Sequence, residues 1–190
     1  MIGGVYYEFI AVPCGSKVTM PLGLIVGQEP AFYVYKGTSL HERLADEGRL
    51  RLLSPYDPLA FLRSIRHELV AEIRWNNDCP VPEETMGAWY ECSYRLWEVD
   101  ENGKWFTCDG LQRITGSHLP YTRMYGCLVE LLVLLTKARA GVWEDWYIPY
   151  AEGLAWCVRR SSRGVSNYVD AANEVLRELR SMRGGAKGLT

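Results

Sequence analysis

The sequence predicts an α+β chain in which a small antiparallel barrel of short strands precedes a group of helices. The first half of the 190 residues is rich in Tyr, Phe, Ile and Val between tight turns. The middle contains an alternating hairpin, and the last third carries leucines at helical spacing. We expect residues 1–120 to form the barrel and residues 121–190 to form a helical extension packed on it.

Composition and charge exclude several classes of protein. Hydrophobic residues make up 48% and charged residues 23%, which is typical of a globular domain. The 21 Lys plus Arg and 23 Asp plus Glu give a net charge of −2, so we expect no nucleic-acid partner. No apolar run approaches the ~20 residues of a membrane span, and no secretory signal is visible. We therefore expect a cytoplasmic protein without a membrane partner.

Three strands are expected in the first 35 residues. Val5–Val12 is rich in β-branched and aromatic residues and predicts the first strand. The extended pattern resumes over Lys17–Val26, where Pro21 and Gly23 interrupt it, and Ala31–Tyr35 predicts the third strand.

A short helix is expected over Leu40–Glu47. Thr38 or Ser39 can cap its start, and Glu42 stands three residues after Ser39, which completes the spacing of a capping box. Gly48 predicts its end.

A further strand is expected over Leu50–Leu53, followed by a second helix. Asp57 can cap that helix, Pro58 suits its first position, and the pattern extends to about His67. Asn76–Pro82 is predicted to be an exposed loop because prolines punctuate it.

The clearest local signal is a hairpin. Ala88–Val99 alternates apolar and polar residues, Asp100–Gly103 contains the Asn-Gly turn, and Lys104–Ile114 is the expected return strand. Three helices should follow. Their predicted ranges are Thr122–Ala140, Ala151–Arg160 and Val165–Met182, with a frayed tail over Gly184–Gly188.

The six cysteines are scattered and form no C-x-x-C pair, which argues against a zinc or redox motif. With only three histidines among them, we expect no metal site. Two interpretations stay open: buried thiols, as in a cytosolic mesophile, or disulfide bridges, as in some thermophiles. The residues are Cys14, Cys79, Cys92, Cys108, Cys127 and Cys157.

No hydrolase signature is present. The sequence lacks a G-x-S-x-G elbow, an H-E-x-x-H helix, a Walker loop and a G-x-G-x-x-G turn. We expect His41, His67 and His118 to be ordinary surface or capping residues.

Two segments together suggest a ligand site. Lys36–Leu40 combines a cation, a glycine, two hydroxyls and a helix start, the groups that a phosphate requires. Taken alone, simple helix capping explains it better. In Met20–Gly23, a proline and a glycine interrupt a strand, which leaves backbone groups able to bind a flat heteroaromatic ring. A simple bulge is the alternative for that segment.

The order of these motifs resembles the flavin reductase-like split barrels, and more closely the mainly archaeal family called domain of unknown function 447. The motifs that carry the resemblance are Thr19–Gly23 (T-M-P-L-G), Tyr35–Leu40 (Y-K-G-T-S-L), Tyr56–Pro58 (Y-D-P) and Tyr121–Lys137. The resemblance covers about residues 4–182. It implies an FMN-binding-type split β-barrel with a C-terminal helical extension.

The resemblance implies a flavoprotein that binds FMN non-covalently as a homodimer, with flavin reductase-like oxidoreductase activity as the enzymatic option. No substrate or catalytic residue can be assigned. Lys36 and the start of the helix would hold the phosphate, the Met20 segment would meet the ring edge, and Ser54 would reach the ribityl chain or the ring. The cofactor-binding residues expected on this basis are Met20, Pro21, Leu22, Gly23, Lys36, Gly37, Thr38, Ser39, Leu40, Arg43 and Ser54.

The sequence departs from the family pattern at several positions. Arg43 stands where the family has Asn, Leu53-Ser54 replaces another Asn position, and Thr122 and Lys137 replace Asn and Arg. Arg43 can supply a second cation beside the phosphate. The alternative function is a cofactor-free split-barrel module for binding or assembly; haem or a deazaflavin is a third option without a motif of its own.

Overall fold

A computed structural model describes residues 1, 3–163 and 165–186 of the chain. The chain divides into two compact units. The barrel unit comprises Met1–Gly3 and Tyr7–Tyr121, and the helical unit comprises Gly4–Tyr6 and Thr122–Thr190. The expectation that the helices pack on the barrel stays a prediction.

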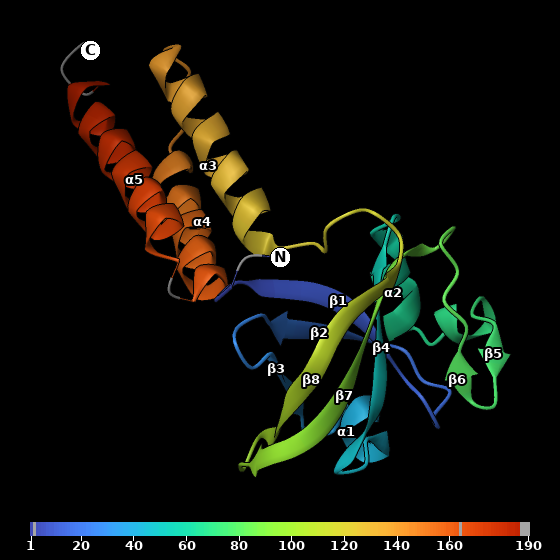
Figure 1. Ribbon diagram of the computed structural model, residues 1–190. Coiled ribbons are helices and arrows are strands. Elements are labelled where there is room, and N and C mark those ends of the chain that lie inside the picture. Colours follow the sequence, from blue (N-terminus) through green and yellow to red (C-terminus); the bar gives the residue numbers. More distant parts are fainter. Residues whose placement is uncertain (2, 164, 187–190) are drawn as a thin grey trace. The chain divides into compact units, whose positions relative to one another are not determined.

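The barrel unit contains six strands that close into an antiparallel barrel in the order β1-β2-β3-β8-β7-β4 (Figure 1). The strands are β1 (Tyr6–Pro13), β2 (Met20–Ile25), β3 (Ala31–Tyr35), β4 (Glu47–Pro55), β7 (Gly87–Val99) and β8 (Gly103–Thr115). The predicted fold class, a small barrel followed by helices, is confirmed.

Large aromatic side chains fill the barrel. Phe32 stacks on Phe106 with ring centroids 5.2 Å apart, and Tyr94 meets Phe106 edge-on at 5.5 Å. Phe9 meets Tyr90 edge-on at 5.4 Å. All five side chains are at most 5% exposed. Such ring pairs add about 0.5–1.5 kcal/mol each beyond their area burial, so the interior is a packed aromatic core.

The predicted hairpin is confirmed as β7 and β8. Its turn is fixed by Asp100, whose Oδ1 accepts hydrogen bonds from the amides of Asn102 and Gly103, both at 2.8 Å. Lys36, directly after β3, donates its amide proton to the Asn102 carbonyl at 2.8 Å. The hairpin turn therefore supports the segment that follows β3.

Helix α1 (Ser39–Arg43) is shorter than predicted. Thr38 caps it, because its hydroxyl accepts a first-turn amide. The expected extension to Glu47 and the stop at Gly48 are wrong, because both residues belong to β4 and pair with β7. A Cβ at Gly48 would lie 2.7 Å from the Tyr94 hydroxyl, so the Tyr94 side chain would have to shift to admit any other residue.

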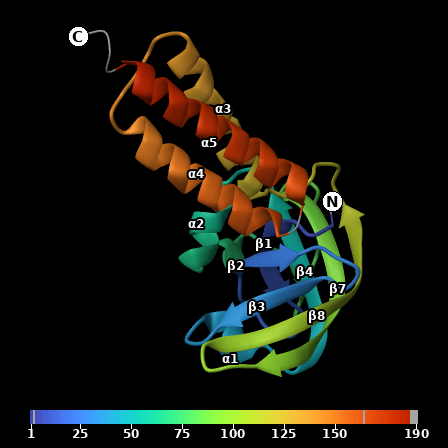
Figure 2. The same ribbon diagram turned by 90° about the vertical axis from the view of Figure 1, so that its left-hand side faces the viewer.

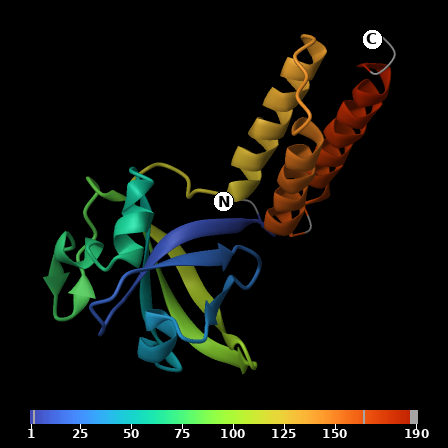
Figure 3. The same ribbon diagram turned by 180° about the vertical axis from the view of Figure 1, so that it is seen from behind.

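Between β4 and β7 the chain forms an arm, residues 56–86, which lies to one side of the barrel (Figure 3). The arm contains α2 (Leu59–Ile65), a 3₁₀ turn η1 (Leu69–Ala71) and the short strands β5 (Trp75–Asn76) and β6 (Cys79–Pro80). The second predicted helix is confirmed, and Asp57 accepts the Leu59 amide at 2.9 Å.

The predicted loop over Asn76–Pro82 contains a hairpin instead. β5 and β6 pair antiparallel, and the turn residues Asn77 and Asp78 have φ of 47° and 58°. Two consecutive left-handed residues make the tight hairpin turn that Asn and Asp favour. The prolines mask this signal in the sequence.

An apolar cluster holds the middle of the arm on the barrel. It consists of Ala60, Leu69 and Ile73 of the arm with Ile10, Val12, Leu53 and Trp89 of the barrel. Strand β1 is therefore buried on both faces, which explains why its sequence is almost continuously apolar.

The helical unit holds α3 (Arg123–Arg139), α4 (Tyr147–Ser162) and α5 (Ser166–Ala186). Arg139 pairs with Glu178 and Arg180 with Glu152, each at 2.7 Å. The predicted helices are confirmed. Helix α4 begins four residues before the predicted start, because Pro149 falls in its first turn, where a missing amide costs nothing.

None of the helices in the described residues is long and apolar enough to cross a bilayer. Helix α5 continues to Ala186, through part of the predicted tail, and the remaining residues 187 and 188 of that tail lie outside the described chain.

All six cysteines form disulfides, so the bridged interpretation is the correct one. Cys14–Cys79 and Cys92–Cys108 lie in the barrel unit, and Cys127–Cys157 joins α3 to α4. Their Cα atoms are 4.1, 5.6 and 6.3 Å apart, respectively.

Candidate ligand site between β2 and β3

The Met20–Gly23 segment lies where β2 parts from β3. In the described chain, β2 pairs with β3 only through Leu24 with Phe32 and Ile25 with Ala31. The two strands run antiparallel (Figure 2), and before Leu24 the described residues of β2 make no pair with β3, so the pairing ends there. Backbone groups beyond this end are not used by β3 and can bind a ligand.

The Lys36–Leu40 segment follows the end of β3. Because β2 and β3 are antiparallel, the end of β3 and the start of β2 belong to the same end of this strand pair. Lys36 and Gly37 are exposed. Gly37 has φ of 80°, and no heavy atom lies within 4 Å of the position a Cβ would take. A full positive charge therefore stands next to an open, glycine-containing turn.

The predicted residues in these two segments divide into buried and accessible ones. Leu22 and Leu40 are 5% and 2% exposed, so their side chains belong to the core. Met20, Pro21 and Gly23 are half-buried. Arg43 is exposed at the last position of α1.

The Thr38 hydroxyl makes two hydrogen bonds within its own turn. It donates to the Tyr35 carbonyl at 2.7 Å and accepts the His41 amide at 3.2 Å. Capping is therefore what this side chain does in the structure, and Lys36 and Ser39 are the side chains better suited to an anion.

Thr19 adds a polar atom at the start of the site. Its side chain is 0% exposed, and its Oγ1 has no hydrogen-bond partner among the described residues. A buried hydroxyl without a partner costs roughly 1–3 kcal/mol. A polar ligand atom that reached this hydroxyl would recover that cost, so the unpaired hydroxyl fits a partly polar ligand.

Tyr33 and Asp100 form the polar contact that ties β3 to the hairpin turn. The Tyr33 hydroxyl donates to Asp100 at 2.6 Å. Partial desolvation, and then this hydrogen bond, raise the pKa of Tyr33 to about 12. The pKa of Asp100 is lowered mainly by the hydrogen bond from the Tyr33 hydroxyl and, to a smaller extent, by the one from the Asn102 amide.

We expect this pair to make stability depend on pH at both ends of the scale. The contribution of Tyr33 to the free energy of unfolding is complete below its unfolded pKa of 10.0. It is lost as the pH rises toward 12. The Asp100 contribution is complete above 3.8 and is lost as the pH falls through its lowered folded pKa. Tyrosinate absorbance during alkaline titration checks the first statement.

Asp100→Asn is the matched control for that titration. It should bring the pKa of Tyr33 down toward its ordinary value while keeping the size of the side chain. An unchanged last tyrosine transition in this variant would contradict the assignment.

Ser54 lies away from these segments. It pairs with Ala88 near the first residue of β7, whereas Lys36 follows Tyr35, which pairs with Gly103 beyond the last residue of β7. Ser54 is 0% exposed, and its hydroxyl is 3.0 Å from Nε2 of His118. The structure therefore does not bring Ser54 together with the other predicted residues.

His118, which the sequence predicts to be an ordinary surface or capping residue, is instead partly buried and contacts Ser54. Its ring lies 4.6 Å from the Tyr56 ring, and its buried Nδ1 has no partner among the described residues. A Ser–His pair without an acid to orient the ring, and with an inaccessible hydroxyl, lacks the requirements of a hydrolytic triad. No spacing in the sequence links His118 to Ser54.

A cavity of about 190 Å³ lies under the arm. Arg63 stands at its wall, 3.0 Å from both Asp57 and Glu72. The Leu59 amide, and then Arg63, lower the pKa of Asp57. Because both carboxylates are already paired with Arg63, the cavity offers no free charge to a ligand.

The site between β2 and β3 thus offers a cation, backbone groups and apolar surface. Neither segment carries a carboxyl, an imidazole or a thiol. The arrangement can bind an anionic ligand with a flat apolar part, and it supplies no proton donor of its own.

Comparison with known proteins finds similarity to solved structures. No family model matches the chain, and no curated protein matches it. Among solved structures, the FMN-bound protein MM1853 from Methanosarcina mazei is 20% identical, with a TM-score of 0.49. The similarity covers 94% of this chain and 96% of that one. The chain is similar to a protein of the domain of unknown function 447 family, the family that its ordered motifs resemble.

Proposed function

We propose that the protein binds FMN non-covalently between β2 and β3. The proposal rests on the antiparallel pairing of β2 with β3, since the start of β2 at Met20–Gly23 and the end of β3 before Lys36 belong to the same end of this strand pair. The buried, unpaired Thr19 hydroxyl supports a polar ligand there. The order of the motifs supports a flavin in particular.

The two segments, Met20–Gly23 and Lys36–Leu40, would bind different parts of FMN. Lys36 and Ser39, with the amides of the turn, hold the phosphate through a charge-assisted contact and hydrogen bonds. The backbone of Met20–Gly23 meets the polar edge of the ring. Bound FMN supplies redox chemistry, and donors at the ring edge favour its reduced, anionic form.

Titration of the purified apoprotein with FMN, followed by flavin fluorescence, tests the proposal. We expect a Kd on the order of 1 µM, equivalent to about −8 kcal/mol. Lys36→Ala should weaken FMN binding roughly tenfold or more, because a charged hydrogen bond contributes about 1.5–3 kcal/mol. Riboflavin, which lacks the phosphate, should bind the wild type and Lys36→Ala equally.

Arg177→Ala, which removes an exposed cation from α5, is the matched control and should leave FMN binding unchanged. No binding below about 100 µM, or equal FMN affinity in the wild type and Lys36→Ala, would falsify the proposal.

Further properties remain part of the proposal. An oxidoreductase reaction, a homodimer and an archaeal source are what the family resemblance implies. A cytoplasmic location, combined with three disulfides, requires a cytoplasm that tolerates protein disulfides, such as that of a hyperthermophile.

The alternative, a cofactor-free binding or assembly module, is favoured by the outward faces of two helices. Val129 and Leu132 on α3, Trp156 on α4 and Trp146 just before α4 are 44–57% exposed. Apolar surface of this kind is typical of interaction sites. Absence of FMN binding, together with self-association or partner binding that is lost in Leu132→Asp, would favour this function.

A further inference from the structure

We propose that the Cys14–Cys79 disulfide is a redox-sensitive latch that fixes the start of β2, and that its reduction by a dithiol loosens the candidate site. The effect on a ligand rests on the proposed function. The loosening of the protein itself does not, and it can be measured without any ligand.

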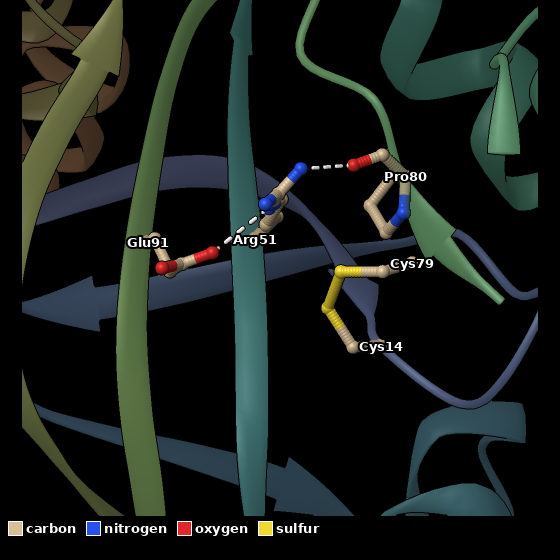
Figure 4. The surroundings of a disulfide bond; sticks show 5 residues. All are labelled: Cys14, Arg51, Cys79, Pro80 and Glu91. Carbon is tan, nitrogen blue, oxygen red and sulfur yellow. Dashed lines mark hydrogen bonds and ion pairs between the residues drawn. A yellow bond between two sulfur atoms is a disulfide. The ribbon is translucent and has the colours of Figure 1, made fainter. Parts of the chain in front are cut away.

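The latch joins two segments that are far apart in the sequence. Cys14 follows β1, and Cys79 begins β6 at the tip of the arm (Figure 4). The base of the arm is fixed separately, because Pro55 and Gly87 are paired on β4 and β7. The disulfide is therefore the covalent tie at the free end of the arm.

The loop held by the latch leads directly into the candidate site. Residues 14–19 connect β1 to β2 and end at the buried Thr19, just before Met20. The first residue of the loop is also held by β4, since the Cys14 amide donates to the Arg49 carbonyl at 3.0 Å. A displacement of the backbone in this loop would therefore be passed on to Met20, which follows the loop directly.

Two polar contacts of the loop also go to the tip of the arm, while Val18 and Thr19 at its end are buried. The Gly15 amide donates to the Asp78 carbonyl at 2.8 Å. Lys17 is 3.6 Å from the Asp78 carboxylate, with both side chains more than half exposed. Exposed ion pairs of this kind contribute little because solvent and salt screen them. Once the disulfide opens, the loop keeps only weak contacts with the arm.

Arg51 also contacts the tip, and Trp75 of β5 packs against the apolar cluster. The Arg51 guanidinium donates to the Pro80 carbonyl and pairs with Glu91 at 2.9 Å (Figure 4). Glu91 lies on the neighbouring strand β7, so Arg51 stays paired when the tip moves away. The departure of the tip therefore leaves no charge without a partner.

The chemistry is thiol–disulfide exchange. A thiolate of the dithiol attacks one sulfur of the bridge, forms a mixed disulfide and expels the other cysteine as a thiolate. The second thiol of the reductant then displaces the first cysteine. Two electrons and two protons pass to Cys14 and Cys79, which become thiols, and the reductant becomes a disulfide.

Accessibility distinguishes this bridge from the second one in the barrel unit. Cys14 and Cys79 are half-buried, whereas Cys92 and Cys108 are each 1% exposed and face the core. Attack requires access to a sulfur atom. Cys127–Cys157 is also half-buried, but it lies in the helical unit and serves as the control.

Hydrogen exchange measured by mass spectrometry tests the latch on four samples. They are the oxidised wild type, the wild type in dithiothreitol, Cys14→Ser/Cys79→Ser, and Cys127→Ser/Cys157→Ser. In the second and third samples we expect exchange over residues 15–20 and 75–81 to rise about tenfold or more, while β7 and β8 stay protected. The fourth sample should match the oxidised wild type over these residues.

FMN titration of the same samples gives the second readout. We expect the affinity to fall about fivefold or more when the latch is open. Unchanged exchange over residues 15–20 overturns the latch, and raised exchange with unchanged FMN affinity overturns its control of the site. If FMN binds no sample, the proposed function fails, and the exchange data alone decide whether the latch exists. Protection of β7 and β8 separates loosening from unfolding.

Discussion

Replacing both cysteines of the Cys14–Cys79 bridge with serine is expected to lower the free energy of unfolding of the barrel unit by about 4 kcal/mol. The two residues are 65 positions apart, so the bridge removes much of the entropy of the unfolded chain. For Cys127 and Cys157, 30 positions apart, the same relation gives about 3.5 kcal/mol. Guanidinium unfolding followed by circular dichroism measures both.

The two double variants control each other because they lie in different units. Cys14→Ser/Cys79→Ser should shift the unfolding transition of the barrel unit, and Cys127→Ser/Cys157→Ser that of the helical unit. A loss smaller than about 1 kcal/mol in the first variant would mean that the arm and the β1–β2 loop stay together in the unfolded chain.

Gly87→Ala is expected to cost roughly 3 kcal/mol or more. Gly87 is the residue at which the arm returns to the barrel, and it has φ of 151°. A Cβ there would overlap the Ser54 carbonyl oxygen and lie 2.7 Å from the Pro55 Cα. Both obstacles are backbone atoms of β4, which cannot move without breaking the pairing of β4 with β7. Thermal unfolding measures the loss.

Gly141→Ala separates the two causes of the loss in Gly87→Ala, which are backbone strain at a positive φ and overlap of the new Cβ with β4. Gly141 also has a left-handed φ, 82°, but no heavy atom lies within 4 Å of its Cβ position. It should cost only the conformational strain, roughly 1 kcal/mol. Equal losses in the two variants would show that β4 yields to the extra methyl group.

Sequence patterns confined to neighbouring residues predict most of the fold. The alternation over β7 and the Asn-Gly turn predict the long hairpin correctly because both the pattern and the turn chemistry are contained within neighbouring residues. Asp57 likewise caps its helix as expected, since a cap depends on residues two positions apart.

Predictions that depend on distant residues were less accurate. Gly48 has the form of a helix stop, but the side chain that a Cβ there would meet is Tyr94, which lies on another strand. Ser54 was grouped with Lys36 from motif order, whereas pairing with Ala88 places it near the other end of β7. Six cysteines allow 15 pairings, and the sequence alone does not choose among them.

The two ends of the arm lie opposite each other, because Pro55 on β4 pairs with Gly87 on β7. A two-residue turn grafted between them would convert β4 and β7 into a continuous hairpin and preserve the strand order of the barrel. The shortened chain would expose Ile10, Val12 and Trp89, which the arm now covers, so polar residues would be needed there. In this topology the arm is an insertion between two paired strand ends, and a segment of another length could join the same ends without changing the strand order.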